Sequence, residues 1–255
     1  MVDGKAGAMK LNTREWGSGP RTALLVHGIM SDSRTWRRVG PELASRGYRV
    51  VGVDLRGHGG SERAAEYPHE AYAADLVETV ESLGLDGVDV AIGHSLGGLA
   101  LLRAAATLQP EHAVYVDPAW RLARREDGVD PALFVHLANR SSAKSIRALN
   151  PKWAPEDVAV EVATLEVWDR QTALDMSKAV IAALDAGTEV PGTGLPETAA
   201  VPSLVIRADN SALIRLRDAD VLRERGFEVR TVPGAGHTVY RDDFEGFMSA
   251  LEGWI

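Results

Sequence analysis

The chain of 255 residues contains no cysteine, which excludes a disulfide framework, a thiol nucleophile and a metal site built on thiolates. No apolar run approaches the length of a membrane span, and residues 1–9 hold no apolar signal-peptide segment. Neither a histidine–carboxylate cluster nor the glycine fingerprint of dinucleotide binding is present. We therefore expect a cytoplasmic protein with no metal, no organic cofactor and no membrane partner.

Basic residues are fewer than acidic ones, with 28 Lys and Arg against 36 Asp and Glu. The formal net charge is therefore -8. This balance argues against nucleic acid and anionic membranes as partners. A hydrophobic share of 45% and a charged share of 25% are those of an ordinary globular protein. The length suffices for one large α/β domain or two small ones. A small molecule is the expected partner, and nothing in the composition specifies an oligomeric state.

The most informative motif is Gly-His-Ser-Leu-Gly at residues 93–97, which fits the pattern G-x-S-x-G. It lies between an apolar strand predicted over 88–92 and a small-residue helix predicted over 96–108. A serine on so sharp a turn projects its hydroxyl clear of the sheet, and the glycines avoid collisions with neighbouring backbone. The N-terminus of the helix favours a developing negative charge. We interpret Ser95 as a nucleophile, with a helix-capping serine as the alternative.

Strands and helices alternate along most of the chain. Further strands are predicted over 22–26, 48–53, 113–116, 203–207 and 227–232, and further helices over 34–46, 69–83, 216–225 and 242–251. Buried strands separated by helices predict an α/β fold with a mainly parallel central sheet flanked by helices. Between residues 118 and 201 the pattern becomes helical and irregular. We predict a helical cap over 118–201, inserted into a core formed by 1–117 and 202–255.

Five stretches together resemble the α/β-hydrolase fold family. They are LLVHG at 24–28, DLRGHGGS at 54–61, GHSLGG at 93–98, VPSLVI at 201–206 and PGAGH at 233–237. The resemblance covers roughly residues 10–255, and the motifs stand in the family's order. In that family the nucleophile precedes the catalytic histidine and a cap follows the sixth strand, as the helical insert does here. The resemblance implies a nucleophile elbow at Ser95 beneath a cap.

A protonated serine is a poor nucleophile and needs a base. We predict that this base is His237, in a glycine-rich loop after the last strand, because an imidazole can accept the proton and later protonate the leaving group. A structural histidine is the alternative. The oxyanion formed during attack needs fixed donors, which the resemblance places on the backbone N–H groups of Ile29 and Leu96.

Two aspartates are candidates for the acid that orients His237. The family usually places this acid after the seventh strand, three residues beyond a glycine, but residues 207–211 read RADNS, so that Asp209 lies two residues early. The family's second solution, at the end of the sixth strand as in haloalkane dehalogenases, matches Asp117. Both remain open, and the aspartate that is not the acid is expected to be a turn or capping residue. We expect substitution of Asp117 to be the more damaging, because Asp209 is out of register.

A serine nucleophile argues against haloalkane dehalogenase and epoxide hydrolase chemistry, whose nucleophile in this family is an aspartate. The sequence predicts a serine hydrolase of carboxylesterase or lactonase type, which cleaves a carboxylic ester, a lactone or a related acyl bond through an acyl-enzyme. The alternatives are hydrolysis of a carbon–carbon bond in a diketone-like substrate and a hydrolase-like receptor with little turnover.

The substrate is expected to contact Met30 and three tryptophans, Trp120, Trp153 and Trp168, which lie in the predicted cap segment. Such aromatic side chains favour an apolar or aromatic acyl or alcohol group. Packing within the cap is the alternative for the tryptophans.

Overall fold

The computed structural model describes residues 7–85, 87–121, 132–188, 190 and 193–255. Residues 1–6, which belong to the segment expected to hold no signal peptide, lie outside the described residues. The described residues contain seven strands in one sheet, in the order β1-β3-β2-β4-β5-β6-β7. The strands are β1 (Asn12–Trp16), β2 (Arg21–Val26), β3 (Tyr48–Asp54), β4 (Val90–His94), β5 (His112–Val116), β6 (Ser203–Ala208) and β7 (Glu228–Val232). Only β1 pairs antiparallel, with β3. The predicted mainly parallel α/β sheet is thus confirmed.

Helices cover both faces of the sheet, because alternate side chains of each strand point to opposite sides. Leu24 of β2 packs into a cluster that includes side chains of α2 (His69–Ser82), α3 (Leu96–Leu108) and α8 (Leu216–Glu224). The next residue, Leu25, packs on the other face with side chains of α1 (Val39–Ser45) and α10 (Phe244–Ala250). Both leucines are fully buried. The sheet is therefore a rigid platform with a core on each side.

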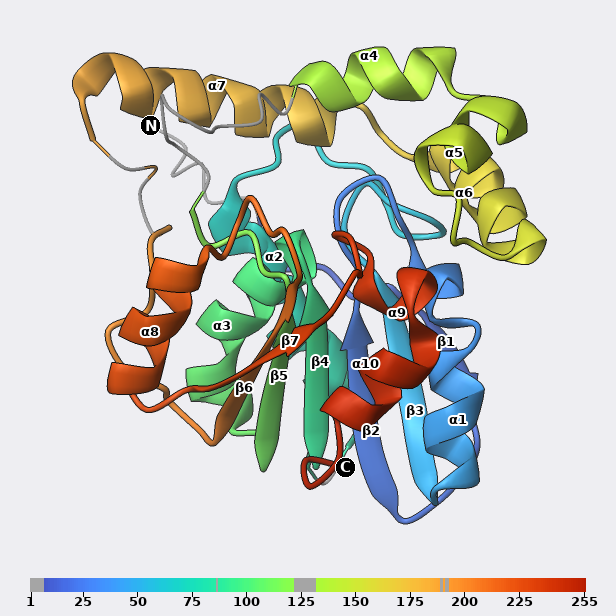
Figure 1. Cartoon of the computed structure of the whole chain (residues 1–255), viewed down its shortest axis with the longest axis vertical. Helices are drawn as coiled ribbons and strands as arrows, with labels where there is room; N and C mark the ends of the chain where they lie inside the picture. The colour runs from blue at the N-terminus through green and yellow to red at the C-terminus, as the bar shows by residue number, and fades with distance from the viewer. Residues whose placement is uncertain (1–6, 86, 122–131, 189, 191–192) are drawn as a thin grey trace.

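Between β5 and β6 the chain leaves the sheet and forms four helices. They are α4 (Ala132–Arg140), α5 (Ala143–Leu149), α6 (Pro155–Val167) and α7 (Gln171–Ala186). Figure 1 shows all four together beyond one end of the sheet. They fall within the predicted helical insert, of which residues 122–131, 189 and 191–192 lie outside the described part.

Two ion pairs join α6 of this insert to the rest of the molecule. Arg37 Nε donates to Asp157 Oδ1 at 2.7 Å, and Arg241 Nη1 donates to Glu161 Oε2 at 2.6 Å. Each arginine lies outside the insert and each carboxylate lies on α6. The insert is therefore held to the sheet-bearing part by charge pairs as well as by packing.

The elements depart from the predicted pattern in three places. The strand β1 has no counterpart among the predicted strands. The predicted helix over 34–46 is a short 3-10 helix, η1 (Ser33–Trp36), followed by α1. Pro41 explains this break, since a proline lacks an N–H group and its ring would collide with the carbonyl four residues earlier. The predicted terminal helix over 242–251 is found as α10, and a further short helix, α9 (Val239–Asp242), precedes it.

Candidate active site

Ser95 occupies the turn between β4 and α3 in a left-handed conformation, with φ +51° and ψ -115°. This conformation is costly for a residue with a side chain, so the surrounding backbone must hold it. The N–H of Ser95 donates to the carbonyl of Val116 at 3.0 Å. A Cβ on Gly93 would lie 2.6 Å from the carbonyl oxygen of Gly97, and one on Gly97 would collide with the carbonyl of Val26. Glycine is therefore required at both flanking positions.

The hydroxyl of Ser95 opens into a cavity of about 430 Å³. Its wall combines residues that follow the carboxyl ends of the parallel strands with residues of the helical insert. The first group includes Ile29, Met30, Ser95, Leu96, Asp117, Asn210 and His237, and the second includes Phe134, Trp153, Glu161 and Met176. The cavity thus lies where the insert meets the strand ends, which is the place where ligands bind to open α/β sheets.

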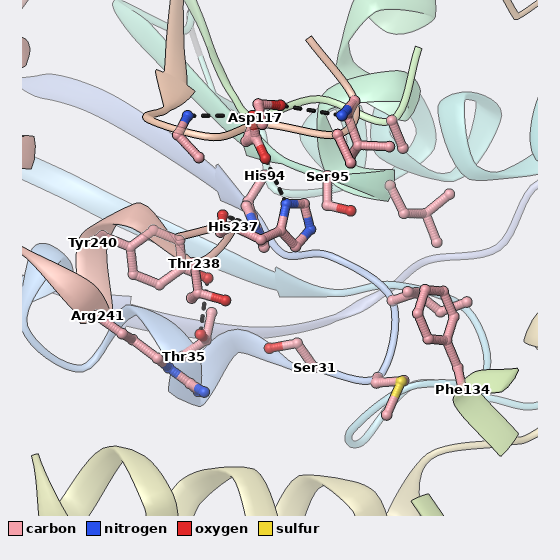
Figure 2. Close-up of a pocket in the computed structure, with 18 of the residues that line it drawn as sticks. Ser31, Thr35, His94, Ser95, Asp117, Phe134, His237, Thr238, Tyr240 and Arg241 are labelled. Atoms are coloured by element: carbon pink, nitrogen blue, oxygen red, sulfur yellow. Dashed lines mark hydrogen bonds and ion pairs between the residues drawn. The ribbon is translucent and has the colours of Figure 1, made fainter. Parts of the chain in front are cut away.

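The imidazole of His237 is hydrogen-bonded to the carboxylate of Asp117, with 2.7 Å between Nδ1 and Oδ2. Because a carboxylate only accepts, the geometry assigns the proton to Nδ1 and leaves the lone pair on Nε2. Asp117 is only 1% exposed, and its Oδ1 accepts from the N–H of Ala208 at 3.3 Å. Figure 2 shows Ser95 and His237 pointing toward one another, with no hydrogen bond between them. Such bonds commonly tighten only when substrate is bound.

The structure does not bring Asp209, the other candidate acid, to His237. Its Oδ2 accepts from the N–H of Gly234 at 2.9 Å, and its own N–H donates to the carbonyl of Ala235 at 3.0 Å. These bonds fix the loop that precedes His237. Asp209 therefore acts as a turn residue of the loop, since its carboxylate is already used by the backbone.

Two further side chains that the sequence analysis did not select hold the loop of His237. His94 Nε2 donates to the carbonyl of His237 at 3.0 Å, and Asp242 Oδ2 accepts from the N–H of Gly236 at 2.8 Å. Burial, reinforced by the nearby His237 ring, lowers the pKa of His94 well below its usual value, so His94 stays neutral. The only sequence signal for His94 is its place beside Ser95, and none marks Asp242.

The two backbone groups expected to bind an oxyanion belong to residues that line the cavity. Leu96 is the first residue of α3, where backbone N–H groups have no partner within the helix. Within the described residues, neither the N–H of Leu96 nor that of Ile29 donates to a protein acceptor. Both N–H groups are therefore available to a negatively charged oxygen next to Ser95.

Met30 and Trp153 also line the cavity, and their contact with substrate stays a prediction. The indole of Trp153 is fixed by a hydrogen bond from Nε1 to Asp242 Oδ1 at 3.0 Å. Asp242 therefore connects the loop of His237 to a wall of the cavity.

The expectation that Trp120 and Trp168 contact substrate needs correction, because neither lines the cavity. Trp120 is fully buried and packs against Phe227 with 5.8 Å between ring centroids. Trp168 is also fully buried, and its Nε1 donates to Thr172 Oγ1 at 2.7 Å. Trp168 packs among side chains of the insert, which is the alternative considered for it, whereas Trp120 packs into the core of the sheet with Tyr115 and Phe227.

Among the residues that the structure describes, no three His, Asp or Glu side chains converge in a way that could hold a metal ion. None of the helices in the same residues combines the length and apolar composition that crossing a membrane requires.

Known proteins resemble this chain both in sequence and in structure. A sequence profile described as the Alpha/beta hydrolase family matches residues 23–250. An N-formylmaleamate deformylase from Pseudomonas putida KT2440 is 28% identical over 257 aligned residues, which cover 96% of this chain and 92% of the relative. A solved N-formylmaleamic acid deformylase from Pseudomonas putida S16 has a TM-score of 0.74 at 25% identity, covering 94% of this chain and 95% of its own.

An esterase from Exiguobacterium antarcticum has a TM-score of 0.73 at 19% identity, covers 94% of this chain and 93% of its own, and so shares the fold. The family profile extends from within β2 to beyond β7 and covers the motifs that carry Ser95, Asp117 and His237. The chain therefore belongs to the alpha/beta hydrolase family.

Proposed function

We propose that the protein hydrolyses an acyl bond of a small molecule through an acyl-enzyme formed on Ser95. The single observation that carries this proposal is the 2.7 Å contact between His237 Nδ1 and Asp117 Oδ2 in the cavity into which Ser95 opens. A histidine oriented in this way can act as a base toward a neighbouring serine. Serine, histidine and aspartate then have the roles of nucleophile, general base and orienting acid.

In the first half-reaction, Ser95 Oγ attacks the carbonyl carbon while His237 Nε2 takes the hydroxyl proton. The negative charge of Asp117 stabilises the imidazolium, and the N–H groups of Ile29 and Leu96 donate to the oxyanion. Loss of one such donor lowers kcat by about 10²–10³ in a comparable enzyme. The imidazolium then gives its proton to the leaving alcohol or amine as the bond to the carbonyl carbon breaks.

In the second half-reaction, a water molecule replaces the leaving group. His237 takes a proton from this water as the water oxygen attacks the acyl carbon. The bond between the acyl carbon and Ser95 Oγ then breaks, and His237 returns the proton to Oγ. The products are a carboxylic acid and the alcohol or amine. In a lactone these two groups stay in one molecule, and the same steps open the ring.

The relatives favour including amides beside esters and lactones among the bonds proposed. The Pseudomonas putida relative is named as a deformylase of N-formylmaleamate, whereas the structural neighbour from Exiguobacterium antarcticum is named as an esterase. An acyl-enzyme mechanism accommodates either leaving group, because His237 can protonate an alcohol or an amine. We therefore propose that the bond cleaved is the acyl bond of an ester, a lactone or an N-acyl compound.

The test compares p-nitrophenyl esters of increasing chain length, lactones, N-formyl amides and a diketone. We expect at least one acyl class to be hydrolysed, and Ser95→Ala to lower its kcat by at least about three orders of magnitude while the protein stays folded. Ser211→Ala is the matched control. Its hydroxyl lies in the same cavity but accepts from the N–H groups of Leu213 and Ile214. Near-normal turnover by Ser95→Ala, or cleavage of the diketone alone, would contradict the proposal.

A further inference from the structure

Arg241 lies in the cavity wall but has no part in the proposed reaction. It belongs to α9, four residues after His237, and is only 4% exposed. Figure 2 shows its guanidinium beyond Thr35, on the side of the cavity away from Ser95. A charged side chain so deeply buried is rare unless its N–H groups have partners.

The surroundings of Arg241 hold the guanidinium in one orientation. Its Nη1 donates to Glu161 Oε2 at 2.6 Å, and its Cζ lies 4.5 Å from the ring centroid of Trp153. The indole is itself fixed by Asp242, through the 3.0 Å hydrogen bond from Nε1. Glu161 of α6 thus occupies one end of the guanidinium, and Trp153, just before α6, lies against one of its faces.

The remaining edge of the guanidinium has no protein partner. Nε and Nη2 of Arg241 are buried, and no described protein atom accepts a hydrogen bond from either. These two N–H groups lie side by side on one edge and point in parallel, which is the fork that receives two oxygens of a carboxylate. Leaving two charged donors unpaired in a buried site is costly, so this edge is suited to an anionic ligand.

The charges around the edge favour a single negative charge. Burial opposes the charged form of Arg241, but the carboxylate of Glu161 and, more weakly, that of Asp157, which is paired with Arg37, raise its pKa, so the guanidinium stays charged. The carboxylate of Glu161 lines the cavity and would repel a ligand with two negative charges, such as a phosphate monoester. A carboxylate carries one charge and has the two coplanar oxygens that the fork requires.

We propose that the free edge of Arg241 binds a carboxylate group of the substrate, at the opposite side of the cavity from the scissile carbonyl. The inference rests on the proposed function, because it takes Ser95 as the reacting residue. It narrows the substrate class to acyl compounds that carry an additional carboxylate. Arg241 is then a residue that sets specificity and binds substrate without moving a proton.

The test uses matched pairs of esters that differ in the terminal group. The anionic set is the mono-p-nitrophenyl esters of adipate, pimelate and suberate, whose carboxylate lies progressively farther from the scissile carbonyl. The neutral set is the p-nitrophenyl esters of hexanoate, heptanoate and octanoate. We expect kcat/KM to favour the anionic ester by about 30-fold to 100-fold at the best length, which is the range for a buried charge-assisted pair. Equal kcat/KM at all three lengths would overturn the proposal.

Variants separate substrate binding from the role of Arg241 in holding α6. Arg241→Lys keeps a charge beside Glu161 but removes the fork, and Arg241→Met removes both. We expect each to remove most of the anionic preference through KM, with kcat/KM for the neutral esters changed less than about threefold. Arg37→Met is the matched control, since it breaks the other ion pair to α6 at a residue outside the cavity wall. An equal loss on both ester sets in Arg241→Lys would assign Arg241 a structural role only.

Binding to Ser95→Ala provides a readout that does not depend on turnover. Calorimetry should give a dissociation constant at least about tenfold lower for the anionic ester than for the neutral one, and Arg241→Lys in the same background should remove this difference. If wild-type protein cleaves neither ester but the binding preference persists, the hydrolase proposal fails and the carboxylate site stands. If neutral esters are cleaved and no preference is seen in binding or turnover, the carboxylate site fails and the hydrolase proposal stands.

Discussion

Replacing Asp117 with asparagine is the substitution whose effect follows most directly from the contacts at the candidate active site. The carboxylate accepts the Nδ1 proton of His237 at 2.7 Å and is almost fully buried. An asparagine keeps the size of the side chain but can offer an N–H group to Nδ1. The imidazole then prefers the tautomer with its proton on Nε2, which cannot accept a proton from Ser95.

We expect Asp117→Asn to lower kcat by about 10⁴, the loss that the same substitution causes in a comparable triad. This loss corresponds to about 5.5 kcal/mol in the barrier, because each tenfold change in rate is about 1.4 kcal/mol. The contribution is large because the negative charge that is removed stabilises the imidazolium in a buried site. The assay is the steady-state rate with the best p-nitrophenyl ester, together with a thermal melt to show that the variant folds.

Asp209→Asn is the matched control. An asparagine oxygen can still accept from the N–H of Gly234, which is the bond that Asp209 makes in the structure. We therefore expect a loss of no more than about 1 kcal/mol in stability and little change in rate. The reasoning is refuted if Asp117→Asn keeps more than a tenth of the wild-type kcat, or if Asp209→Asn is the more damaging change.

Two other predictions concern stability. Trp168→Ala should lower the free energy of unfolding by about 3–5 kcal/mol, because it empties a fully buried site, whereas Trp153→Ala, at the cavity wall, should chiefly raise KM. Urea titrations measure the first effect and ester kinetics the second. The prediction is contradicted if the two variants change the free energy of unfolding and KM to the same extent. Burial, with the nearby His27, lowers the pKa of His58 to about 3, so below pH 6.5 the unfolded chain binds a proton that the folded chain excludes. The contribution of this group to stability is intact above pH 6.5 and is lost as the pH falls, by about 1.4 kcal/mol per pH unit. Urea unfolding at pH 7 and pH 5 should show a smaller decrease for His58→Asn than for wild type, and an unchanged decrease would contradict the assignment.

The parallel strands and their helices could be predicted because buried strands leave uninterrupted apolar runs. The strand β1 could not be predicted in this way, since it is an edge strand whose side chains are exposed or half-buried. Its place in the sheet depends on backbone pairing with β3. The break between η1 and α1 follows from Pro41, whose effect on the backbone the apolar pattern of residues 34–46 does not show. Local apolar patterning thus reports the interior of the sheet better than its edge.

At the site, the sequence motifs located Ser95 and His237 because each stands at a strand end with characteristic glycines. The tryptophans show the limit of such reasoning, since an aromatic residue type does not reveal which of several apolar spaces its ring fills. Arg241 was missed for a related reason. Its environment is made by Glu161 and Trp153, which lie about eighty residues earlier in the chain and meet it only through the fold of the insert.

Locating a covalent adduct on the chain tests directly whether Ser95 is the nucleophile that forms an acyl-enzyme with help from His237. The protein is treated with a fluorophosphonate or quenched in acid during turnover of an ester, and the adduct is located by peptide mass spectrometry. We expect one adduct per chain on the peptide that contains Ser95, none in Ser95→Ala, and much slower labelling in His237→Ala. An adduct on another residue, or undiminished labelling of Ser95→Ala, would contradict this role of Ser95.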